Sequence, residues 1–254
     1  MKMLILLLEV ILFILISWYL YLFFYRNSIE TSMTFVAIGV QEEYDYTKNG
    51  FEEYNIISWE NSIHGIFLDN KKPQTIYYFH GNGAPLSDYI WEVYDYSQSF
   101  FEYMKKEKWL KLENIIIFWH SIGTGVGTDF AFKNKVEKLI LVSPLASRYD
   151  MSIKSFGFVL QKILFMKNSF DTYWKIAEIT IPTLIIHGNK DEVIPYSQWK
   201  KVFENAGTKE KYFITLEGFW HNGIFENYGN ELQKPIKDFL EKWMLETSQI
   251  TINK

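Results

Sequence analysis

Five short apolar runs, spread over the second part of the chain, constrain its fold most strongly. They are rich in aliphatic and β-branched residues, and the central ones show no alternation of apolar with polar residues. Such runs are typical of strands buried on both faces of a sheet. Segments with helical patterning separate them, which predicts an α/β fold with a mostly parallel sheet flanked by helices. The runs are Thr75–Phe79, Ile115–Phe118, Leu139–Val142, Thr183–Ile186 and Tyr212–Leu216.

A hairpin is expected ahead of the first run. It would pair Tyr54–Trp59 with Ile63–Leu68 across a polar turn. The predicted helices cover residues 88–105, 122–132, 151–165, 197–206 and 235–245. Pro235 suits the first turn of the last of them, because the amide proton that proline lacks has no helical partner there.

The first 25 residues predict a membrane anchor. Met3–Phe24 contains one charged residue, Glu9, and a helix of that length reaches ~33 Å, enough for a hydrocarbon core of ~30 Å. A cleaved signal peptide is the alternative. It is less favoured because its apolar core would be shorter and would end at small residues. The predicted organisation is a transmembrane helix over 1–25, a connector over 26–50 and an α/β domain over 51–254.

The charges that flank this apolar segment bear on its orientation. Lys2 precedes it, whereas Arg26 and Glu30 follow it. The positive-inside rule then favours a cytoplasmic N-terminus. We therefore expect a single-pass membrane protein with its large domain on the non-cytoplasmic side.

Composition excludes several classes of function. The 254 residues, 48% of them apolar, suffice for one sizeable core. A net charge of −4 gives no basic field to attract nucleic acid. The absence of cysteine rules out disulfides, thiol catalysis and thiolate metal sites. No metal-binding or phosphate-loop motif is present, so no cofactor and no metal are expected.

Three polar residues each follow one of the apolar runs. Ser121 comes after the second run, Asp191 after the fourth and His221 after the fifth. A serine can attack a carbonyl, a histidine can take and return its proton near neutral pH, and an aspartate can orient that histidine. The sequence therefore predicts a nucleophilic site that joins these three side chains.

Ordinary structural roles remain open for the same residues. Ser121 can be a serine at a strand end, and Asp191 can stabilise a turn, with Glu192 as a second candidate acid. The other histidines are predicted to be structural, namely His64, His80, His120 and His187.

The chain resembles the α/β-hydrolase superfamily from about residue 54 to residue 243. The resemblance rests on Trp119-His120-Ser121-Ile122-Gly123, on the run from Gly188 to Pro195, and on Gly218-Phe219-Trp220-His221-Asn222. Within the superfamily it is most similar to small membrane-anchored serine hydrolases without a large lid, the serine aminopeptidase-like group. This resemblance implies a triad of Ser121, Asp191 and His221, with oxyanion donors on the backbone amides of Asn82 and Ile122.

Two features depart from the superfamily pattern. The interval from His80 to Ser121 has room for about one helix, so one helix–strand unit is expected to be missing. Trp119 stands where glycine is usual, and its side chain is predicted to point away from the nucleophile.

The leading functional expectation is a membrane-anchored serine hydrolase. Its substrate would be an ester, thioester or amide of a small or lipid-like acyl group. The alternative is a catalytically inactive relative that serves as a membrane-tethered binding or scaffold protein.

Overall fold

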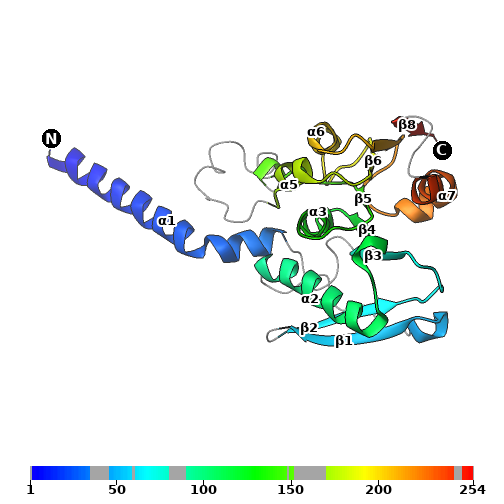
Figure 1. Ribbon diagram of the computed structural model, residues 1–254. Helices are drawn as coiled ribbons and strands as arrows, with labels where there is room; N and C mark the ends of the chain where they lie inside the picture. The colour runs from blue at the N-terminus through cyan, green and yellow to red at the C-terminus, as the bar shows by residue number, and fades with distance from the viewer. Residues whose placement is uncertain are drawn as a thin grey trace.

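A computed structural model describes most of the chain and divides it into an N-terminal helix, a hairpin and a larger α/β unit (Figure 1). The described residues are 2–34, 46–58, 61–79, 90–147, 149–151, 170–242 and 248–253.

Six strands form one parallel sheet in the order β3-β4-β5-β6-β7-β8. All five predicted runs are strands of this sheet, in chain order, whereas β8 lies where the sequence predicts no element. The strands are β3 (Thr75–Phe79), β4 (Ile115–His120), β5 (Lys138–Val142), β6 (Thr183–Gly188), β7 (Lys211–Leu216) and β8 (Gln249–Ile252).

Helices alternate with these strands, as predicted, and an N-terminal helix precedes all of them. They are α1 (Lys2–Thr34), α2 (Ile90–Lys108), α3 (Gly123–Lys133), α5 (Thr172–Glu178), α6 (Ser197–Asn205) and α7 (Ile224–Lys242), with short 3-10 turns η1 (Tyr46–Asn49) and η2 (Leu112–Asn114). The sequence does not predict α5. Most of the helix predicted over 151–165 lies outside the described residues.

The start predicted for the last helix is wrong. α7 begins at Ile224, and Pro235 lies inside it. The buried side chains of Ile224, Tyr228, Leu232 and Phe239 are separated by four, four and seven residues. This spacing places them on one apolar face of the helix. Burial of this face against the sheet outweighs the hydrogen bond that proline cannot donate.

The helices cover both faces of the sheet (Figure 1). One face packs against α7, which contributes buried side chains to a cluster with alternate residues of β4 to β7. The intervening strand residues face a second cluster that includes side chains of α2, α3, α5 and α6. This double burial explains why the central strands are continuous apolar runs.

The predicted hairpin is confirmed. β1 (Glu52–Ser58) pairs in antiparallel register with β2 (Asn61–Phe67) as a separate two-stranded sheet. It packs beside α2, where a Cβ on Gly65 would lie 2.0 Å from the Phe100 ring. Glycine is therefore required at this close approach of strand and helix.

The connection from β3 to β4 leads to the strand that directly precedes Ser121. These strands are direct neighbours, with Phe79 opposite Trp119. Between them the described residues contain one α-helix, α2. That arrangement agrees with the prediction of a domain that lacks one helix–strand unit.

The N-terminal helix differs from its prediction. α1 continues to Thr34, past the expected end at residue 25, and extends away from the rest of the chain in Figure 1. Within the part of the chain that the structure describes, none of the helices is both apolar and long enough to span a bilayer. The transmembrane anchor and the single-pass topology are therefore not supported.

Candidate active site

Ser121 lies in the sharp turn between β4 and α3. Its backbone φ is +55°, in the left-handed region that side-chain-bearing residues rarely occupy. Its amide donates to the Val142 carbonyl at 2.9 Å, and its own carbonyl accepts the hydroxyl of Thr124 at 2.6 Å. The surrounding structure thus holds a conformation that costs on the order of 1–3 kcal/mol, as is common at functional sites.

The structure brings Ser121, His221 and Asp191 together. The hydroxyl oxygen of Ser121 lies 2.8 Å from His221 Nε2, and His221 Nδ1 lies 2.8 Å from Asp191 Oδ2. All three side chains are at most 8% exposed. They follow β4, β7 and β6, whose carboxyl ends meet at one edge because the strands are parallel. The hydroxyl, the imidazole and the carboxylate thus form one hydrogen-bonded series, which is the arrangement that nucleophilic catalysis by a serine requires.

The Asp191 carboxylate is held at both oxygens. Oδ1 accepts the amides of Val193 at 3.0 Å and Ile194 at 2.8 Å. Burial by itself would raise the pKa of Asp191, but hydrogen bonds from His187, His221 and the Ile194 amide outweigh it and hold that pKa well below its usual range. The side chain is therefore ionised at neutral pH.

The second candidate acid, Glu192, occupies a different position. Its Oε2 accepts the backbone amide of His221 at 3.3 Å. Asp191, and not Glu192, contacts the imidazole Nδ1. Glu192 instead helps to fix the loop that carries the histidine.

His120 lies against the histidine of this cluster. The ring centroids of His120 and His221 are 5.1 Å apart. Burial, followed by the charge of His221, lowers the pKa of His120 to about 4, although a hydrogen bond to the His221 backbone acts in the opposite direction. His120 is consequently neutral near pH 7, and it adds no positive charge beside the base.

Trp119 is accommodated beside the turn without blocking it. Its side chain is fully buried, and its Nε1 donates to the Tyr77 carbonyl of β3 at 2.9 Å. A Cβ on Gly127 of α3 would lie 2.7 Å from the indole. The indole therefore fills the space between β3 and α3, away from the Ser121 hydroxyl.

Only part of the predicted oxyanion hole is described. Ile122 directly precedes α3, so its amide belongs to a helix N-terminus that favours negative charge. Asn82 lies in the range 80–89, outside the described residues. In the portion of the chain that is described, no three His, Asp or Glu side chains are grouped as a metal site requires.

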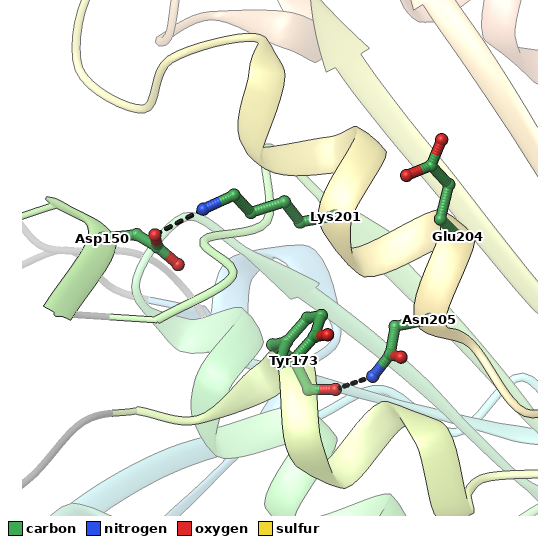
Figure 2. Close-up of a pocket in the computed structure, with 5 residues that line it drawn as sticks. All are labelled: Asp150, Tyr173, Lys201, Glu204 and Asn205. Carbon is green, nitrogen blue, oxygen red and sulfur yellow. Dashed lines mark hydrogen bonds and ion pairs between the residues drawn. The ribbon is translucent and has the colours of Figure 1, made fainter.

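A pocket between α5, α6 and the segment after β5 is a different feature (Figure 2). Asp150 pairs with Lys201 there, and the Asn205 amide donates to the Tyr173 carbonyl. Glu204 lies 3.7 Å from Lys200. Four of the five lining residues therefore bind one another in two pairs, and these pairs link the helices around the pocket.

Sequence reasoning missed the position of one histidine. His187 of β6 is fully buried, and its Nε2 lies 3.3 Å from Asp191 Oδ2. The sequence assigns it a structural role at a strand end. Its spacing of four residues from Asp191, across a tight Gly188-Asn189 turn, is the signal that could have placed it here.

Comparisons with known proteins agree with this fold. A profile described as serine aminopeptidase, S33, matches residues 155–228. Alpha/beta hydrolase domain-containing protein 17B of Homo sapiens is 35% identical over 133 residues, which are 52% of this chain and 43% of that protein. Putative alpha/beta hydrolase L404 of Acanthamoeba polyphaga mimivirus is 28% identical over 58% of this chain and 54% of that protein.

Solved structures extend the similarity over more of the chain. An esterase of Pyrococcus furiosus superposes with a TM-score of 0.64 at 13% identity, over 82% of this chain and 96% of the esterase. Together, the profile match, the relatives and the superposed fold support assignment to the α/β-hydrolase superfamily. Another solved structure, Est1E of Butyrivibrio proteoclasticus, superposes with a TM-score of 0.55 at 14% identity, over 73% of this chain and 98% of that chain. The chain spans about half the length of the curated superfamily proteins that it matches.

Proposed function

We propose that the protein is a serine hydrolase that cleaves an ester, thioester or amide bond of a small or lipid-like acyl substrate. The observation that carries the proposal is the continuous hydrogen-bonded series from Ser121 through His221 to Asp191, with 2.8 Å at each step. Esterases among the superposed structures support the reaction class. The similarity to the serine aminopeptidase profile and to alpha/beta hydrolase domain-containing proteins also supports a hydrolase.

The proposed reaction uses each side chain in a defined role. Ser121 Oγ attacks the substrate carbonyl while His221 Nε2 takes its proton, which leaves an imidazolium beside the ionised Asp191. His221 then returns the proton to the leaving group, and an acyl-enzyme forms on Ser121. Water attacks this ester in the second half, again with His221 as the base, and free Ser121 is restored.

The developing negative charge requires donors near Ser121. In this proposal the backbone amides of Ile122 and Asn82 supply them. Each such donor is typically worth ~2.7–4 kcal/mol in the transition state. The left-handed backbone at Ser121 makes the strand-to-helix turn sharp, and such a turn typically presents a serine hydroxyl at the end of the sheet.

The test is turnover of a short-chain aryl ester by wild type, Ser121→Ala and His221→Ala. Both variants should lose at least ~10³-fold in kcat and reach similar residual rates, because members of a triad act as a unit. Phe225→Ala, at an exposed position of α7, is the matched control and should keep wild-type turnover. Equal activity in wild type and both site variants would contradict the proposal.

A further inference from the structure

We propose that His187 is a positioning residue that holds the Asp191 carboxylate in the orientation His221 needs. This inference rests on the proposed function of the same site. It concerns a buried side chain that takes no part in the proposed proton transfers.

The contacts of the His187 ring determine which nitrogen carries its proton. Nε2 lies 3.1 Å from the Ile194 carbonyl oxygen and 3.3 Å from Asp191 Oδ2. Both partners are acceptors, so Nε2 must be the donor. Nδ1 is buried, and the described residues offer it no hydrogen-bond partner. A proton there would be a buried unpaired donor, so the neutral Nε2–H tautomer fits this environment.

His187 completes the set of donors around the carboxylate. Oδ1 accepts two loop amides, from Val193 and Ile194, and these fix one side of the group. Oδ2 accepts His221 Nδ1, and His187 Nε2 lies 3.3 Å away, so the single proton on Nε2 is shared between this oxygen and the Ile194 carbonyl. Without His187, His221 would be the only side chain among the described residues that contacts Oδ2, and His221 is the group that Asp191 has to orient.

Other side chains also lie close to His187 and Asp191. Glu192 contacts the His221 backbone, and the ring centroids of His120 and His221 are 5.1 Å apart. Tyr196 meets the His187 ring edge to face, with centroids 5.7 Å apart, and its hydroxyl bonds Thr215 at 2.6 Å. His187 is thus fixed by packing in the plane that directs Nε2 to Asp191.

Two variants separate the donor from the ring. His187→Phe keeps a ring but removes the donor, and kcat should fall about tenfold or more with KM unchanged, as expected for the loss of one hydrogen bond to a charged group. His187→Gln retains an N–H donor and should recover most of that loss. Val202→Ala, a buried position on α6, controls for lost stability and should keep the wild-type kcat.

A spectroscopic readout makes the test independent of turnover. Nitrogen NMR of the wild-type protein should show His187 as the Nε2–H tautomer. The downfield proton on His221 Nδ1 should shift in His187→Phe and return toward its wild-type position in His187→Gln. An Nδ1–H tautomer at His187 would overturn the proposal without any variant.

The outcomes for His187 and for the proposed function are distinguishable. If wild type cleaves esters and His187→Phe changes neither kcat nor the His221 proton, the positioning role is wrong and the hydrolase function stands. If wild type cleaves no ester but the proton shifts as described, the positioning role stands and the proposed function fails.

Discussion

At the scale of the residue, Trp119 shows how a departure from a sequence pattern is absorbed by its neighbours. Its indole is fully buried, donates to the Tyr77 carbonyl and contacts the Tyr77 ring edge to face at 5.7 Å. Gly127 leaves the room that the indole occupies. The indole is therefore accommodated between β3 and α3, next to the turn at Ser121.

Replacement of Trp119 by glycine should destabilise the fold. The change leaves a cavity under α3 and the Tyr77 carbonyl without its donor, and loss of a large buried aromatic typically costs ~3–5 kcal/mol. Thermal and denaturant unfolding beside wild type measure the change. Trp174→Ala, at a tryptophan that is 69% exposed on α5, should change stability far less. A higher melting temperature for Trp119→Gly would show that the indole obstructs the turn.

At the scale of the element, Asp129 and its two lysine partners connect three helices. It is buried on α3 and pairs at 2.8 Å with Lys133 of the same helix and with Lys175 of α5. The amines of both lysines also lie over the ring of Tyr94 on α2, at 5.9 and 4.7 Å. These contacts hold α2, α3 and α5 in position on one face of the sheet.

Asp129→Asn should therefore lower the free energy of unfolding by about 1–2 kcal/mol, since both lysines reach water and the loss is partly screened. Asp238→Asn is the matched control, because Asp238 also pairs with two lysines, but both lie on its own helix α7. Its effect should be clearly smaller. Chemical denaturation compares the two variants, and equal losses would contradict a role for Asp129 in joining helices.

Local patterns predict the strands and the site better than the helix boundaries. Continuous β-branched runs identify the central strands, and the order of Ser121, Asp191 and His221 names the residues that meet at the sheet edge. The start of α7 could not be predicted, because burial against the sheet overrides Pro235. The role of His187 depends on the turn at Gly188-Asn189, which brings Asp191 back beside the end of β6. The four-residue spacing is compatible with such a turn but does not by itself specify it.

At the scale of the whole molecule, stability should depend on pH through His120. Its pKa is about 4 in the folded protein, against 6.5 for an ordinary histidine. As pH falls through that window, the unfolded chain binds a proton that the folded chain does not, so folding weakens by up to about 3 kcal/mol. Below that window, protonation of Asp191, whose pKa is also lowered, removes further stability.

Denaturant titrations of wild type and His120→Phe between about pH 7 and pH 4 measure this contribution. The wild-type free energy of unfolding should fall more steeply than that of the variant, because phenylalanine has no proton to bind. The two curves should converge toward acid pH or cross there. Parallel curves would mean that folding does not perturb His120.

The geometry of the whole site implies that Ser121 is an activated nucleophile. Reaction with a fluorophosphonate probe, followed by mass spectrometry of the labelled peptide, tests it most directly. We predict covalent labelling of wild type at Ser121 and none in folded Ser121→Ala, with slower labelling in His221→Ala. Failure of folded wild type to react, or equal labelling of Ser121→Ala, would contradict it.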